Sequence, residues 1–196
     1  PAFGLDALWI NESDKDRAQF AGYTVVDVGT VITTHVTEII KSHAHELLGR
    51  QEVQELLDNL SKHTPKLVEE VIPTILSLSI LQQVLSGLLR EGVSIRNLRT
   101  ILETLADHGP TIKNIERLIE LTRRALASAI TTKLVSDDGI LTLASLTPQL
   151  ERALGDALTV TEGGSYLALE PTIAQKLIGK LKSLTERFAQ KGLTPV

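Results

Sequence analysis

The sequence predicts a mainly α-helical fold, in which a central all-helical region is followed by a small, incomplete α/β unit. Only 3% of the 196 residues are aromatic, so the core is built mainly from Leu, Ile, Val and Ala, which pack well between helices. Over residues 50–130 one helical pattern follows another with short breaks, as in a bundle. After Lys133 an alternating apolar segment and Gly-containing turns indicate strands.

The first fifty residues combine short elements with one longer helix. Residues 11–22 predict a short helix with Ser13 as its N-cap. Residues 23–26 predict a buried strand, because aromatic and β-branched side chains stand together there. Thr30 is the expected cap of a helix over residues 31–48, whose apolar positions keep helical spacing.

Prolines, glycines and hydroxyl residues separate the helices of the central region. Pro residues end helical patterns, and Gly commonly follows a helix C-terminus. The expected helices are a stripe of Val53, Leu56, Leu57 and Leu60 that ends at residues 63–65, a short helix over residues 66–72 that stops at Pro73, one from Ser77 or Ser79 to Gly92, one from Ser94 to the Gly109-Pro110 pair, and one over residues 114–132.

The last third reads as an α/β unit, with a boundary near residues 128–136. Residues 139–146 alternate as a strand does, and residues 166–169 predict a second short strand. Thr147 and Pro148 predict the start of a helix that ends near residue 158, and Pro171 starts one of about 18 residues. Two strands and two helices leave an exposed sheet edge and an uncovered helix face, so we expect the unit to be incomplete.

Composition restricts the classes of function. Twenty basic and twenty-four acidic residues give a net charge of −4 without long runs, which argues against nucleic-acid binding. The absence of cysteine excludes disulfides and thiolate chemistry. Apolar runs are far shorter than the roughly 20 residues of a membrane span, so the chain is expected to be soluble. Its start at Pro1, with Trp9 in an apolar stretch, suggests a cut inside a larger protein.

Catalytic and metal-binding patterns are weak. His43 and His45 point about 200° apart on a helix, and His35 lies roughly 12 Å of helical rise from His43, so neither pair suits one ion. Arg96 and Arg99 could grip a partner's carboxylate, although such arginines more often form surface ion pairs. We find no nucleophile held by a base and no phosphate-binding glycine motif. We therefore expect no enzyme activity, no metal and no cofactor.

The apolar content around residues 3–34 has two interpretations. Phe3, Val26 and Val31 lie on short elements that cannot bury all of their surface within thirty residues. They either pack against a missing upstream part of the protein or line a groove for a partner's helix. The residues alone leave both interpretations open.

Four segments carry a resemblance to a known family. PAFGLDALWI, AGYTVVD, TVITTHVTEIIKSHAHELLGRQEVQELLD and EGVSIRNLRTILETLADHG together resemble the cytoplasmic C-terminal region of the FHIPEP family of type III export-gate proteins, in its flagellar branch. The resemblance runs along essentially the whole chain and is strongest through Leu105. The family also includes the export-gate proteins of injectisomes, which remain the alternative within the same class.

The resemblance implies a large bacterial inner-membrane protein, with its transmembrane half upstream and a cytoplasmic portion of four subdomains arranged in a nine-membered ring. Pieces of two α/β subdomains would then precede the helical one. On that scheme residues 1–27 are the tail of the second subdomain and residues 28–47 return to the first. Residues 48–127 form the all-helical third, and residues 128–196 an incomplete α/β fourth.

The resemblance also implies partners and a site. Export chaperones that carry flagellar substrates dock in an apolar dimple, whose lining matches Phe3, Val26, Val31 and Thr34. Further implied partners are other copies of the chain and other export-apparatus proteins, including the export ATPase complex. Asp6 and Val28 stand where the family commonly has Pro, so the backbone is less rigid at both edges of the dimple. Two hypotheses from different functional classes compete with docking: a metal-dependent hydrolase and a purely structural helical adaptor.

Overall fold

A computed structural model describes residues 6–136, 138–161 and 164–190 of the chain. Its contacts divide the chain into two compact units, Pro1–Ser128 and Ala129–Val196. The described residues are mainly helical and contain one two-stranded sheet, which confirms the predicted fold class. The finer division into four subdomains, with boundaries after residues 27, 47 and 127, stays a prediction.

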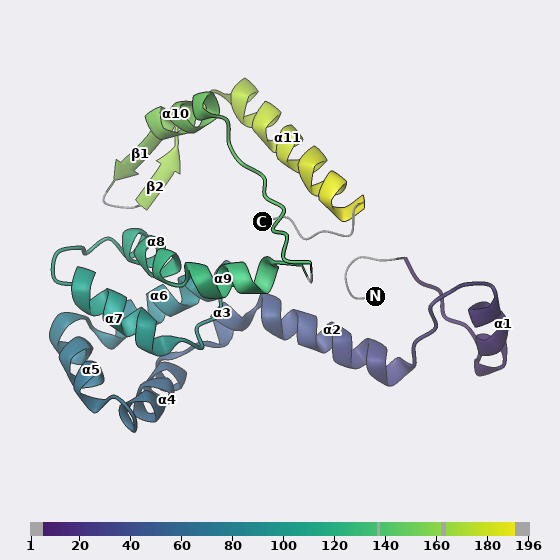
Figure 1. Cartoon of the computed structure of the whole chain (residues 1–196), viewed down its shortest axis with the longest axis horizontal. Helices are drawn as coiled ribbons and strands as arrows, with labels where there is room; N and C mark the ends of the chain where they lie inside the picture. The colour runs from purple at the N-terminus through teal and green to yellow at the C-terminus, as the bar shows by residue number, and fades with distance from the viewer. Residues whose placement is uncertain (1–5, 137, 162–163, 191–196) are drawn as a thin grey trace. The chain divides into compact units, whose positions relative to one another are not determined.

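Helices make up the regular structure of the described part of the first unit (Figure 1). The segment η2 is a 3₁₀ turn, η3 is π-helical, and α9 crosses from the first unit into the second. In chain order they are η2 (Glu12–Asp14), α1 (Lys15–Phe20), α2 (Val28–Ser42), α3 (Ala44–Leu47), α4 (Arg50–Ser61), α5 (Pro65–Glu69), η3 (Glu70–Ile75), α6 (Leu78–Arg90), α7 (Leu98–His108), α8 (Ile115–Ala125) and α9 (Ala127–Leu134).

The core of the first unit lies among α4, α6, α7 and α8. Helix α8 packs against both α6 and α7, and α6 also packs against α3 and α4. The buried side chains recur three or four residues apart, so each helix turns one apolar face inward. They are Val53 and Leu57 on α4, Leu81, Val84, Leu85 and Leu88 on α6, Leu98, Ile101, Leu102 and Leu105 on α7, and Leu118 and Thr122 on α8.

Side-chain caps set the starts of α6 and α8. The Ser77 hydroxyl accepts a hydrogen bond from the N–H of Ile80 at 3.3 Å, so Ser77 rather than Ser79 begins α6. The Asn114 side chain accepts one from the N–H of Arg117 at 2.8 Å. Each cap satisfies one of the N–H groups that a helix N-terminus leaves without a partner. The predicted start of α8 is confirmed.

Helix α7 begins later than predicted. Asn97, not Ser94, is its N-cap, and its side chain accepts a hydrogen bond from the N–H of Thr100 at 3.4 Å. The Ser94 hydroxyl accepts one from the N–H of Arg96 at 3.4 Å instead. Serine in such a local turn offers the backbone an alternative to the helix, which explains the later start.

Three predicted helices have different ends. Residues 31–48 form α2 and α3, with a break at His43, and α2 already begins at Val28. Residues 114–132 form α8 and α9, which meet at the C-cap Leu126. The short helix before Pro73 continues as η3, but Ile72 leaves helical geometry (φ −119°, ψ 123°). The ring of a proline disfavours helical geometry in the residue before it.

Two of the predicted strands are wrong. Residues 23–26 and residues 139–146 both lie in irregular segments. A strand forms only where its backbone N–H and C=O groups pair with a second strand. Composition alone cannot supply that partner, and among the described residues neither segment pairs with one.

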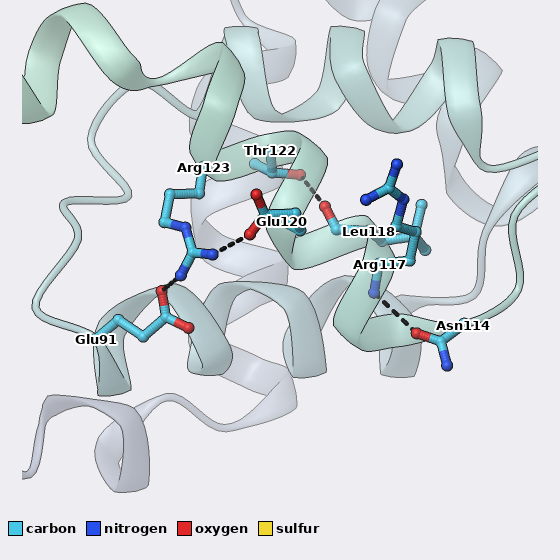
Figure 2. A network of polar contacts seen from close by, with 7 residues as sticks. All are labelled: Glu91, Asn114, Arg117, Leu118, Glu120, Thr122 and Arg123. Atoms are coloured by element: carbon cyan, nitrogen blue, oxygen red, sulfur yellow. Dashed lines mark hydrogen bonds and ion pairs between the residues drawn. The ribbon is translucent and has the colours of Figure 1, made fainter. Parts of the chain in front are cut away.

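An ion-pair network joins α8 to the end of α6. Figure 2 shows the Arg123 guanidinium donating to two carboxylates, Glu91 at the C-cap of α6 and Glu120 one turn earlier on α8. On the neighbouring face the buried Thr122 hydroxyl donates to the Leu118 carbonyl at 2.8 Å. The one buried polar side chain identified in the described core is therefore satisfied by its own helix.

The second unit contains α10 (Pro148–Ala157), β1 (Leu158–Thr161), β2 (Gly164–Leu167) and α11 (Pro171–Gln190). The two strands pair antiparallel, with Leu158 opposite Leu167. Thr147 caps α10 by accepting from the N–H of Leu150 at 3.4 Å, as predicted. Strand β2 begins two residues earlier than predicted, and β1 occupies residues that the sequence did not assign to a strand.

No single helix among the described residues is long and apolar enough to span a membrane. One bent pair, Pro65–Ile75 with Leu78–Arg90, meets the same criteria of length and composition when the two are taken together, with a bend of 106°. Its side chains Val71, Leu81 and Leu85 are buried in the first unit. This pair belongs to the helical core described above.

Candidate docking site

The structure places the four predicted docking residues unevenly. Val26 stands in the irregular segment before α2 with 55% of its surface exposed. Val31 and Thr34 lie in the first two turns of α2, and both are half-buried. Phe3 lies outside the described residues. The described part of the site is therefore the start of α2 and the residues just before it.

Helical geometry brings two of these residues together. Val31 and Thr34 are three residues apart on α2, and side chains at that spacing are neighbours on one helix face. Val26 precedes the helix by two residues, so its position depends on how the chain enters α2. The site combines an aliphatic side chain and a hydroxyl on one helix face with an exposed valine that precedes the helix in the chain.

Asp27 controls the start of α2. It has extended backbone geometry (φ −76°, ψ 160°), and its Oδ1 accepts a hydrogen bond from the N–H of Thr30 at 2.9 Å. The Thr30 hydroxyl in turn donates to Asp27 Oδ2 at 2.5 Å. These two bonds, the one from the hydroxyl first, lower the pKa of the Asp27 carboxyl, because they favour its charged form.

The sequence prediction assigned the cap to Thr30 and missed Asp27. Asp and Thr are both common N-caps, and the two candidates are only three positions apart in the sequence. The missed signal was the Asp27-x-x-Thr30 spacing itself, since an N-cap side chain accepts from the N–H two or three residues later. The hydrogen bonds show that Thr30 is the third residue of the helix and Asp27 its cap.

Helix α2 has a second, apolar face. Helical periodicity places Val28, Ile32, Val36, Ile39 and Ile40 on a stripe of their own, and these side chains are 46–57% exposed. The helix has no buried residue. Helical periodicity places Thr34 on the side of α2 opposite this stripe, whereas Val31, three residues after Val28, lies at the edge of the stripe.

Among the histidines and arginines singled out in the sequence, His43, His45 and Arg99 have local partners, while the buried Nδ1 of His45 has no hydrogen-bond partner among the described residues. His43 Nδ1 lies 3.0 Å from the carbonyl oxygen of Ile39, and His45 Nε2 lies 3.7 Å from a carboxylate oxygen of Glu46. Arg99 donates to Glu103 at 2.8 Å along α7. In the part of the chain that the structure describes, no group of three His, Asp or Glu side chains has a geometry that could hold a metal ion.

The chain is similar in sequence to flagellar biosynthesis proteins from several bacteria. The chain is 45% identical over 196 residues to the flagellar biosynthesis protein FlhA of Bacillus subtilis. It is 42% identical over the same length to the FlhA protein of Escherichia coli. The alignment covers all of this chain but only 29% and 28% of the two relatives, so the chain spans less than a third of their length.

Solved structures share the fold. The structure of a complex of the CdsV and CdsO proteins of Chlamydia pneumoniae matches 89% of this chain and 51% of the other chain, with a TM-score of 0.79 and 29% identity. A nonameric SctV-C structure from EPEC matches 89% of this chain and 53% of the other, with a TM-score of 0.72 and 31% identity. The family model described as FHIPEP matches residues 1–196, and the chain therefore belongs to the FHIPEP family.

Proposed function

We propose that this chain is part of the cytoplasmic docking platform of a flagellar type III protein export gate. The observation that carries the proposal is its 45% identity over all 196 residues to a flagellar biosynthesis protein. Identity to the nonameric SctV-C from EPEC is 31%, so the flagellar role is favoured over an injectisome role. The proposed function is non-enzymatic, and it places the protein at the cytoplasmic face of the bacterial inner membrane.

The proposed docking site is formed by Phe3, Val26, Val31 and Thr34. The partner is an export chaperone with its substrate, which presents the apolar face of an amphipathic helix. Exposed and half-buried valines offer the apolar contact, and the Thr34 hydroxyl adds a directional hydrogen bond. The helix carries no fully buried residue, so Val31 and Thr34 keep surface that a partner could cover, which supports this role.

The proposed assembly is a ring of nine copies. A nonameric solved structure with the same fold supports it. CdsV, whose solved structure shares the fold, forms a complex with a second protein, CdsO, which supports the proposal of further partners from the export apparatus, including the export ATPase complex.

The docking proposal is tested by affinity measurements on the whole cytoplasmic region of the longer protein, with a purified flagellar chaperone–substrate complex. Thr34→Ala and Phe3→Ala are each expected to weaken binding by about tenfold or more. Thr33→Ala is the matched control, because Thr33 is exposed on a different face of α2. Unchanged affinity in both Thr34→Ala and Phe3→Ala would overturn the docking site.

Two further measurements distinguish a ring-forming docking protein from a monomeric adaptor and from a hydrolase. The mass of the assembled cytoplasmic region is expected to correspond to nine copies, and a protein that stays monomeric at all concentrations would contradict the ring. Metal analysis of the purified protein tests the hydrolase hypothesis, which requires a stoichiometric ion. Neighbouring genes for flagellar rather than virulence secretion would support the flagellar branch.

A further inference from the structure

The docking residues lie on either side of one capping interaction. Val26 immediately precedes Asp27, and Val31 and Thr34 follow it within two helical turns. The direction in which the chain enters α2 therefore sets how Val26 stands relative to the other two. That direction is fixed by the backbone of Asp27 and by its two hydrogen bonds to Thr30, at 2.9 Å and 2.5 Å.

Within the described residues, burial does little to hold this part of the chain. Residues 21–30 contain no buried side chain, and α2 as a whole contains none. Val28, the first helical residue, is 56% exposed, and no ring restricts its φ as a proline at this position would. The hydrogen bonds from Thr30 to Asp27 are thus the side-chain interactions that fix the start of α2.

We propose that Asp27 is the positioning residue of the docking site, whose carboxylate holds the start of α2 so that Val26 is presented together with Val31 and Thr34. This inference rests on the proposed docking function. Asp27 acts through Thr30 and the helix start, and it makes no required contact with the partner. A different side chain that caps the helix equally well should therefore preserve part of the affinity that Asp27 provides. A residue that presets φ at the first helical position should do the same.

The test uses the whole cytoplasmic region of the longer protein and a purified chaperone–substrate complex. Asp27→Ala removes the cap and is expected to weaken binding about fivefold. Asp27→Ser keeps a capping oxygen without the charge, and its affinity should stay within about twofold of the parent. Val28→Pro in the Asp27→Ala background should recover part of the loss, because proline presets φ at the first helical position.

A matched control and a second measurement separate positioning from general destabilisation. Asp14 precedes α1 as Asp27 precedes α2, but its side chain makes no capping hydrogen bond, so Asp14→Ala should leave the affinity unchanged. Hydrogen exchange at the amides of Thr30 and Val31 should accelerate in Asp27→Ala and return toward the parent rate in Asp27→Ser. The buried amides of α6 should exchange at the parent rate in all variants.

Each outcome decides the inference. Unchanged affinity in Asp27→Ala, with Thr34→Ala weakened, overturns the positioning role and leaves the proposed docking function in place. Equal losses of affinity in Asp27→Ala and Asp27→Ser, with amide exchange at the parent rate in Asp27→Ser, also overturn the positioning role. They would show that the partner contacts the negative charge of Asp27 directly. Unchanged affinity in Asp27→Ala, Thr34→Ala and Phe3→Ala together overturns the docking function itself.

Discussion

Gly87 on α6 lies so close to Ile119 on α8 that a Cβ atom added to the glycine would stand 2.3 Å from Ile119 Cδ1 and 3.1 Å from its Cγ1. A contact of 2.3 Å is shorter than packed atoms allow, and one of 3.1 Å is tighter than most real contacts. The close approach of these two helices, which builds the core of the first unit, therefore depends on the absence of a side chain at residue 87.

Gly87→Ala is expected to lower the free energy of unfolding by about 1 kcal/mol. Overpacking costs about 1–3 kcal/mol, and the better helix propensity of Ala offsets up to about 1 kcal/mol of it. Urea unfolding measures the difference. Ile119→Val removes the Cδ1 atom that the added methyl group would meet. The double variant should therefore lose less unfolding free energy than the sum of the losses in Gly87→Ala and Ile119→Val.

The control for this variant is Gly179→Ala in α11. A Cβ atom at residue 179 would meet nothing within 4 Å, so only the gain in helix propensity applies there. Gly179→Ala should leave stability equal or higher. A Gly87→Ala protein as stable as the parent would show that α6 and α8 can separate at no cost.

Leu85→Ala is expected to lower the free energy of unfolding by about 2–5 kcal/mol. Leu85 is 0% exposed on α6, and truncation of such a residue leaves a cavity in addition to the lost transfer energy. Leu8→Ala is the matched control, because Leu8 is 91% exposed, and its effect should stay within about 0.5 kcal/mol. Equal effects of the two variants would contradict the described core.

The Arg123 pairs are expected to contribute little to stability. The Arg123 and Glu91 side chains are 39% and 41% exposed, so solvent screens their attraction and the coupling between them should be about 0.2–1 kcal/mol. A double-mutant cycle of Arg123→Ala and Glu91→Ala at low salt measures it, and about 1 M salt should reduce it. A coupling that is unaffected by salt would contradict this account.

The start of α2 should respond to acid through Asp27. The folded-state pKa of its carboxyl lies below the ordinary value of 3.8, chiefly because the Thr30 hydroxyl donates to it. Its contribution is therefore fully present above that ordinary value and is lost as pH falls through the lower, folded pKa. The chemical shift of the Thr30 amide should be constant between about pH 5 and 8 and titrate only below the ordinary value.

Asp27→Asn is the control for the acid response, because it removes the titrating group and keeps a capping oxygen. The Thr30 amide of this variant should show no acid step. A midpoint at or above 3.8 in the parent protein would contradict the hydrogen bonds that the structure shows at this carboxylate.

Much of the helical fold follows from local signals in the sequence. The sequence predicts helices that begin at Asn114 and at Thr147, and both side chains accept a capping hydrogen bond in the structure. The strands were harder. Residues 139–146 alternate well, yet no described segment pairs with them, whereas β1 (Leu158–Thr161) forms because β2 pairs with it. Strand formation depends on such a non-local partner, which periodicity does not contain.

The candidate site was predictable only where it depends on helical periodicity. The helical period places Val31 beside Thr34, and the structure has both on α2. The position of Val26 depends on the chain direction before the helix, which the choice between Asp27 and Thr30 as cap decides. Both residue types suit that position, so only the hydrogen-bond geometry distinguishes them.

Helix α2 contains no buried residue, so the thermal stability of the first unit and the proposed binding at α2 depend on different residues. A helix of fifteen residues is at best marginally stable alone in water, while most of the buried side chains of the first unit lie on α4, α6, α7 and α8. Among the described residues, the start of α2 therefore adds little to the unfolding energy of that core. Substitutions at residues 26–34 are consequently expected to leave the melting temperature of the helical unit unchanged, so the thermal stability of a variant does not report on the proposed binding of a partner.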